Sequence, residues 1–180
     1  MSLPDAWEEC KNSTCPAAAP PVKNPGKDTY KVDPQAGAAT TCNIPCACRL
    51  FSAPKTDTAG NETWSWESNP QNVYEADKKQ FKWICVKPVI DDEDHVICAS
   101  GACVLSEKDV KEGGRVIETW VRCTKDSAAP CSDPCLCKLY KLIYDQAHPD
   151  KKRDEKWKPE KQPAKRDPDY SYICLCVKTP

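Results

Sequence analysis

A repeated pattern of cysteines constrains the fold of this 180-residue chain more than any other feature. The segment Cys-Asn-Ile-Pro-Cys-Ala-Cys-Arg-Leu-Phe at residues 42–51 recurs at an offset of 89 as Cys-Ser-Asp-Pro-Cys-Leu-Cys-Lys-Leu-Tyr at residues 131–140. Two more cysteine segments recur in the same order at offsets of 88 and 89: Cys10–Cys15 as Cys98–Cys103, and Phe81–Cys85 as Tyr170–Cys174. Three ordered matches indicate a duplication. We therefore expect two tandem homologous units, residues 1–90 and 91–180.

The composition predicts that these units are held together by covalent bonds. Leu, Ile, Val and Phe together account for only 27 of the 180 residues, below the roughly 20% expected of a domain with a self-sufficient core. Disorder would usually accompany a large net charge, whereas the net charge here is −1. With 14 cysteines and 17 prolines, the chain is expected to be a small disulfide-rich fold, mainly β with abundant coil.

The cysteines form an even set, as complete pairing into disulfides requires. We expect all of them to be bonded: Cys10, Cys15, Cys42, Cys46, Cys48, Cys85, Cys98, Cys103, Cys123, Cys131, Cys135, Cys137, Cys174 and Cys176. Removing the repeated positions leaves Cys123 and Cys176, both in the second half. We predict that these two residues are bonded to each other.

Strand geometry limits the other pairings. In an extended segment Cys46 and Cys48 point to the same face and lie too far apart to bond comfortably with each other. Each is therefore expected to reach a different partner. Cys48–Cys85 and the corresponding Cys137–Cys174 are the candidate pairs between strands, among fifteen formal connectivities per unit.

Structural zinc is the alternative explanation of the cysteine clusters, because it is commonly bound by pairs of the form C-x2–4-C. The pattern argues against zinc, since the repeat conserves no histidine: His95 aligns with Trp7, and His148 with Ala59. An all-cysteine site would also leave two cysteines unused in each unit. We therefore expect no metal and no cofactor.

Local patterns predict several short elements. Alternation of apolar and polar residues with period 2 predicts strands, and capping residues followed by glycine predict a short helix. The expected strands are Phe81–Val86, Arg115–Cys123, Cys135–Tyr144 and Tyr170–Val177; the expected short helices are Ser106–Gly114 and Pro4–Glu9; the expected long loops are Pro16–Gln35 and His148–Pro168.

Three tryptophans in divergent loops are the candidate binding residues. Trp64 and Trp66 lie on the same side of an extended segment, and Trp157 lies in the corresponding loop of the second half. Flat amphipathic rings provide a large contact area for a protein or a sugar. The alternative is that these rings fill a core that has only two phenylalanines.

Charged and apolar segments exclude some function classes. The near-neutral charge argues against nucleic-acid binding, which needs a basic face, and no apolar run is long enough to span a membrane. Met1–Trp7 has no secretory signal pattern. We interpret the acidic segment Asp91–His95 as a solvated linker and the mixed-charge segment Lys151–Arg166 as a soluble loop.

These observations favour a non-enzymatic, secreted, disulfide-stapled protein that binds a protein or glycan, or that self-assembles. The glycosylation triplets at Asn12 and Asn61 agree with an extracellular location. One alternative is a bacterial effector or toxin, exported without a signal peptide by a dedicated machine, which could use His148 and Asp150. A second is a cytosolic zinc-binding interaction module.

Overall fold

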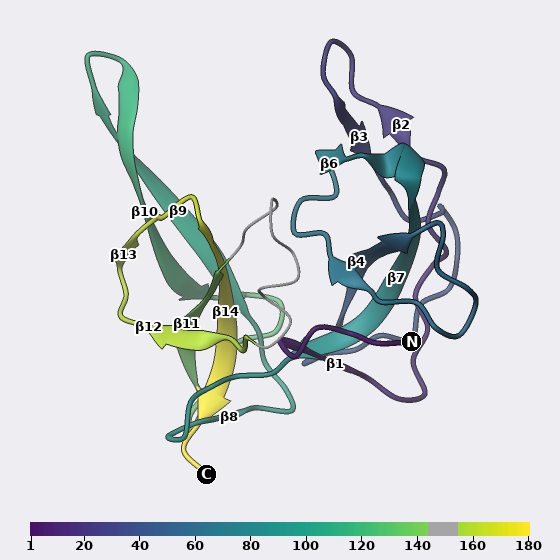
Figure 1. The fold of residues 1–180 in the computed structure, drawn as a ribbon. Helices are drawn as coiled ribbons and strands as arrows, with labels where there is room; N and C mark the ends of the chain where they lie inside the picture. Colours follow the sequence, from purple (N-terminus) through teal and green to yellow (C-terminus); the bar gives the residue numbers. More distant parts are fainter. Residues whose placement is uncertain (144–154) are drawn as a thin grey trace. The chain divides into compact units, whose positions relative to one another are not determined.

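The computed structural model describes residues 1–143 and 155–180 (Figure 1). The described chain is mostly β, as predicted, with strands β1 to β14 and one turn of 3-10 helix, η1 (Ala76–Lys78). It separates into two compact units, unit 1 (Met1–Lys87) and unit 2 (Pro88–Pro180). Within the described residues, no helix has the length and apolarity needed to cross a membrane.

Unit 1 contains two sheets. The larger has the strand order β1-β7-β4-β5, and the smaller has the order β2-β3-β6. The bounds are β1 Trp7–Glu9, β2 Val22–Lys23, β3 Thr29–Lys31, β4 Ala47–Pro54, β5 Ser65–Trp66, β6 Val73–Tyr74 and β7 Lys79–Pro88. The central strands β4 and β7 are antiparallel, with Cys48 directly opposite Cys85.

Unit 2 also contains two sheets, with strand orders β12-β11-β14-β8 and β13-β10-β9. The bounds are β8 Val96–Ile97, β9 Cys103–Glu112, β10 Arg115–Lys125, β11 Leu136–Ile143, β12 Lys158–Glu160, β13 Ala164–Lys165 and β14 Tyr170–Lys178. Matched in chain order, β8 to β14 have the same neighbours as β1 to β7. The central strands β11 and β14 are antiparallel, with Cys137 opposite Cys176.

Each of the four predicted strands overlaps an observed strand: β7, β10, β11 and β14. The predicted loop Pro16–Gln35 contains the short strands β2 and β3, and the described part of His148–Pro168 contains β12 and β13. Period-2 alternation identified the longer strands correctly, whereas strands of two or three residues are too short to produce such a pattern.

Both predicted helices are wrong. Ser106–Gly114 lies in β9 and the turn that follows it, and β9 pairs along its whole length with β10. Gly113 and Gly114 both have positive φ, 58° and 79°, which suits a tight hairpin turn and not a helix end. Pro4–Glu9 contains a turn that leads into β1. In both segments, pairing with a distant strand overrides local helix signals.

All fourteen cysteines lie in the described residues, and all are in disulfides, as predicted. Unit 1 has Cys10–Cys46, Cys15–Cys48 and Cys42–Cys85; unit 2 has Cys98–Cys135, Cys103–Cys137, Cys131–Cys176 and Cys123–Cys174. Cys46 and Cys48 do reach different partners. Seven disulfides indicate an oxidising environment.

The specific pairings that we predicted are wrong. Cys123 bonds to Cys174 and not to Cys176, because the register places Cys176 in the position that Cys85 has in unit 1. The main chain supports this match: the N–H of Cys10 donates to the Cys85 carbonyl, and the N–H of Cys98 donates to the Cys176 carbonyl. The correct offset for this strand is therefore 91, which also aligns Cys-Val-Lys at residues 85–87 with residues 176–178.

The predicted pairs Cys48–Cys85 and Cys137–Cys174 do not form either. Cys48 lies opposite Cys85 in the ladder, but it bonds to Cys15, which comes from outside the strand pair. Cys137 likewise bonds to Cys103. The disulfides therefore fasten peripheral segments to the central strands, where they add cross-links that the β ladder does not provide.

The two units fill their interiors differently. In unit 1, Leu50 on one face of β4 packs in a cluster with Val32, Val73 and Ala76. In unit 2, one buried cluster consists of cysteines, with Cys98, Cys131 and Cys176 at its centre. A second cluster joins Val121, Leu139 and Cys174. Disulfide sulfur thus occupies interior volume that aliphatic side chains fill in larger domains.

Candidate binding site

The three candidate tryptophans lie largely inside the two units. Trp64 and Trp157 are buried, with 4% and 0% of their surface exposed. Trp66 is half-buried, and its ring lies 5.1 Å from the ring of Trp7, which in turn makes an edge contact with Phe51. Since a buried ring offers little contact area, Trp64 and Trp157 serve the packing of their units, and a binding role for the half-buried Trp66 stays a prediction.

The β9–β10 hairpin contains the two longest strands of unit 2. Its strands run from Cys103–Glu112 and Arg115–Lys125, whereas the matching strands β2 and β3 of unit 1 have only two and three residues. Figure 1 shows β9 and β10 as a long two-stranded ribbon whose turn extends beyond β11 and β14. The sequence signal for this hairpin was Gly113–Gly114 between two charged strands, which we had assigned to the end of a helix.

The base of this hairpin is firmly attached to unit 2. The Cys103–Cys137 and Cys123–Cys174 disulfides tie one residue of each hairpin strand to the central strands. The main-chain N–H of Cys123 also donates a 2.7 Å hydrogen bond to the side chain of Gln162. These contacts fix the base of the hairpin to the central strands of unit 2.

In the distal half of the hairpin, β9 and β10 pair only with each other. β13 pairs with β10 only at Trp120 and Val121, and β9 is the edge strand of its sheet. A β-bulge between Val116 and Glu118 leaves Ile117 without an opposite residue. Bulges redirect side chains and increase the local twist.

The bulge places two aliphatic side chains at the tip of the hairpin. Val116 and Ile117 are 51% and 55% exposed, and exposed charged residues lie near them along the two strands: Lys108, Asp109, Lys111, Glu112 and Arg115. We call these seven residues the hairpin tip. An apolar centre with a charged rim is the arrangement typical of small protein-binding surfaces.

A buried polar network is the second notable site of unit 2. The Asp92 side chain, only 4% exposed, accepts hydrogen bonds from Tyr140 Oη at 2.7 Å and from Lys138 Nζ at 3.0 Å. His95 Nδ1 lies 3.0 Å from the same oxygen, and the N–H of Asp94 donates to the other oxygen. Our interpretation of Asp91–His95 as a solvated linker is therefore wrong for the side chains of Asp92 and His95, whereas Asp91, Glu93 and Asp94 are exposed.

The surroundings of Asp92 and Tyr140 shift the pKa values of both side chains. Burial alone would raise the pKa of the Asp92 carboxyl, but hydrogen bonds from Tyr140, Lys138 and the Asp94 main chain outweigh burial and lower this pKa to about 2. Burial and the neighbouring Asp92 carboxylate raise the pKa of Tyr140. The network is a carboxylate held by three side chains, which fastens the start of unit 2 to β11.

The aligned positions of unit 1 contain a different cluster. Trp7, Arg49 and Phe51 stand where the sequence repeat aligns His95, Lys138 and Tyr140. Arg49 lies over the Trp7 ring at 5.9 Å, and burial lowers the pKa of its guanidinium. Unit 1 thus fills this position with rings in edge contact and an arginine over one of them, and unit 2 fills it with a charged network.

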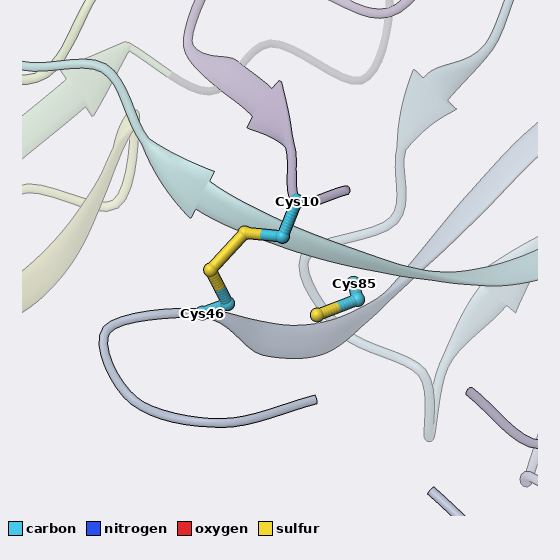
Figure 2. Close-up of side chains that lie close together, drawn as sticks. All are labelled: Cys10, Cys46 and Cys85. Atoms are coloured by element: carbon cyan, nitrogen blue, oxygen red, sulfur yellow. A yellow bond between two sulfur atoms is a disulfide. The ribbon is translucent and has the colours of Figure 1, made fainter. Parts of the chain in front are cut away.

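Cysteine triplets are the remaining groups that have the composition of a metal site. Figure 2 shows Cys85 beside the Cys10–Cys46 disulfide, and the three sulfurs lie within 4.8 Å of one another. Each of these sulfurs is already bonded to another sulfur. Because zinc is bound by thiolates, a triplet would have to be reduced before it could act as a ligand set.

Some predicted features lie outside the described residues. The effector alternative depends on His148 and Asp150, which are not among the described residues. The start of the mixed-charge segment Lys151–Arg166 also lies outside them. The described end of that segment carries paired charge: Arg166 forms a 2.7 Å ion pair with Glu107 of β9. Asn12 and Asn61 are both exposed.

Comparison with known protein families, curated proteins and solved structures gave no match for this chain.

Proposed function

We propose that this chain is a secreted, non-enzymatic binding protein made of two copies of one disulfide module, and that the hairpin tip of unit 2 contacts a protein partner. The observation that carries this proposal is the exposure of Val116 and Ile117 at 51% and 55% on a hairpin whose base is fixed by two disulfides. Two adjacent exposed aliphatic side chains at the end of a hairpin offer a small apolar surface that a partner could cover.

The chemistry of the tip favours a protein over a glycan. Sugar rings are usually held by the exposed flat faces of aromatic side chains. None of the seven tip residues is aromatic, and Trp120, which pairs with Lys108, is half-buried. Two aliphatic side chains with charges of both signs near them suit a small apolar contact with a polar rim. The fixed base of the hairpin also favours binding, because attachment of the base limits the conformational entropy that is lost when a partner binds.

The matched architecture of the two units supports the duplication. Three disulfides per unit connect corresponding cysteines in the same order, with separations of 36, 33 and 43 residues in unit 1 and 37, 34 and 45 in unit 2. The strand order is also the same. Because the long hairpin of unit 2 has only a short counterpart in unit 1, we assign the contact with the partner to that hairpin.

The proposal can be tested with an array of immobilised extracellular proteins probed with the full chain. We expect the variant Val116→Ser/Ile117→Ser to bind its target at least about tenfold more weakly than the wild type, since two buried aliphatic contacts are lost. The matched control is Val22→Ser, which alters an equally apolar side chain in unit 1 that is 64% exposed and should leave binding unchanged.

Two results would contradict the proposal. Equal binding by the tip variant and the wild type would remove the hairpin tip as the contact surface. Selective binding to a parallel glycan array, without binding to any protein, would show that the class of partner is wrong. Sedimentation of the chain alone at several concentrations shows whether the bound protein is a second copy.

A further inference from the structure

The sulfur atoms of each unit form one continuous cluster. In unit 1 the sulfurs of Cys10, Cys46 and Cys85 lie within 4.8 Å of one another, as do those of Cys15, Cys42 and Cys48. Figure 2 shows the first triplet, in which the Cys85 sulfur lies next to an intact disulfide. The Cys42–Cys85 bond has one sulfur in each triplet, so it connects the two outer disulfides.

Unit 2 has the same arrangement. Its triplets are Cys98, Cys135 and Cys176, and Cys103, Cys131 and Cys137. The Cys131–Cys176 bond again connects them. The additional disulfide, Cys123–Cys174, contributes to neither triplet. The chain therefore contains clustered disulfides and, in the same molecule, one disulfide outside the clusters.

We propose that the sulfur cluster of unit 1 is a thiol–disulfide relay that takes an external thiol as its co-reactant. An external thiolate attacks the Cys10 sulfur, forms a mixed disulfide with it, and releases Cys46 as a thiolate. Cys46 then attacks the sulfur of Cys85, which forms Cys46–Cys85 and releases Cys42 as a thiolate. Each step exchanges one S–S bond for another, so no further oxidant or reductant is needed.

The second triplet carries the exchange to the other side of the unit. The Cys42 thiolate lies within 4.8 Å of both sulfurs of the Cys15–Cys48 bond. Attack on Cys15 forms Cys15–Cys42 and releases the Cys48 thiolate. The entering thiol stays bonded to Cys10, and the free thiolate passes from Cys46 to Cys42 and then to Cys48. No cysteine leaves its own triplet in these steps.

Burial explains why the relay is assigned to unit 1. Among its six clustered cysteines only Cys85, the central one, is buried, and the outer disulfides are partly exposed. In unit 2, three of the six are buried: Cys98, Cys131 and Cys176. Exchange requires access of the attacking thiolate to sulfur, so an external thiol can enter the cluster of unit 1 more readily.

The variant Cys10→Ser tests the relay because it leaves Cys46 as an unpaired thiol inside the first triplet. After incubation at pH 8, acid quenching and alkylation, peptide mapping should find the label on Cys42 and Cys48 as well as Cys46, together with a Cys46–Cys85 peptide. The matched control is Cys123→Ser, whose unpaired Cys174 belongs to no triplet. In the control the label should stay on Cys174, with roughly tenfold less rearrangement.

Two further measurements test the relay: the first separates it from exchange between molecules, and the second identifies a thiolate as the attacking group. The rate of the relay should not depend on protein concentration. It should also be roughly 75-fold slower at pH 6 than at pH 8, because the thiolate fraction of an ordinary cysteine falls by that factor. Label confined to Cys46 in Cys10→Ser, as in the control, would overturn the proposal.

A second experiment uses the wild-type chain, in case the variant does not fold. Less than one equivalent of a phosphine reductant opens single disulfides, and acid quenching then preserves the resulting pairs. The relay predicts rearranged pairs such as Cys46–Cys85 among the clustered cysteines of unit 1. Recovery of only native pairs, with both members of each opened bond alkylated, would also overturn it.

Discussion

The disulfide that unit 1 lacks, Cys123–Cys174, allows a quantitative test of the stabilisation that cross-links provide. We predict that the variant Cys123→Ala/Cys174→Ala lowers the free energy of unfolding of unit 2 by about 3 kcal/mol. The two residues are 51 apart in the sequence, and an isolated cross-link over that distance would contribute about 4 kcal/mol through the entropy of the unfolded chain.

The neighbouring bridge reduces this contribution. Cys131–Cys176 remains closed in the variant, so the path between Cys123 and Cys174 in the unfolded chain is only about ten residues long. A loop of that length contributes about 2.7 kcal/mol. Contacts of the buried Cys174 with Val121 add a smaller amount, which gives the total of about 3 kcal/mol.

Hydrogen exchange with mass spectrometry in increasing denaturant measures this change for unit 2 separately. Peptides from β11 and β14 should lose protection at lower denaturant in the variant, and peptides from β4 and β7 should be unchanged, which provides an internal control. A decrease below about 1 kcal/mol in unit 2 would refute the loop-entropy argument. An equal decrease in both units would refute the assignment of the effect to this bridge.

Three further predictions concern single features. Asp92→Asn should destabilise unit 2 by about 2 kcal/mol at neutral pH. Because the pKa of Asp92 in the folded state is lowered to about 2 from 3.8, this contribution is fully present above about pH 4 and is lost as the pH falls towards 2. Acid unfolding followed by circular dichroism should therefore show a difference between variant and wild type that disappears towards pH 2. Trp157→Ala should cost about 3–5 kcal/mol in denaturant unfolding, since the ring is fully buried, whereas Arg115→Ala at the exposed hairpin should change it by less than about 0.5 kcal/mol. Limiting phosphine should release thiols from unit 1 before unit 2, as measured by timed alkylation, because fewer of the clustered cysteines of unit 1 are buried; simultaneous release would contradict this.

The comparison of the two units indicates where they have diverged. The central strands and three disulfides correspond, but Trp7 and Phe51 form a ring contact in unit 1, whereas the aligned His95 and Tyr140 join a network around Asp92 in unit 2. A ring cluster is insensitive to pH, while a buried carboxylate is not. The two units should therefore differ in acid stability.

The sequence alone determined the features that depend on composition and on neighbouring residues. An even number of cysteines in a chain poor in aliphatic residues indicated complete disulfide bonding, because such a chain needs cross-links to be stable and the repeat lacks the histidines common in zinc sites. Period-2 alternation located the strands around Phe81–Val86, Arg115–Cys123, Cys135–Tyr144 and Tyr170–Val177. These signals are local, so they can be detected without knowing which segments meet.

Only the tertiary structure decided which segments meet. Cys123 bonds to Cys174 because the register of β11 and β14 places Cys176 opposite Cys137, and a shift of two residues keeps the same strand face, so alternation cannot distinguish the two cysteines. Residues 106–112 form a strand because β10 pairs with them, although their local sequence favours a helix. Long-range pairing also buries Asp92 beneath Lys138 and Tyr140. Such pairings depend on the free energy of the whole packed unit, which no short segment of sequence contains.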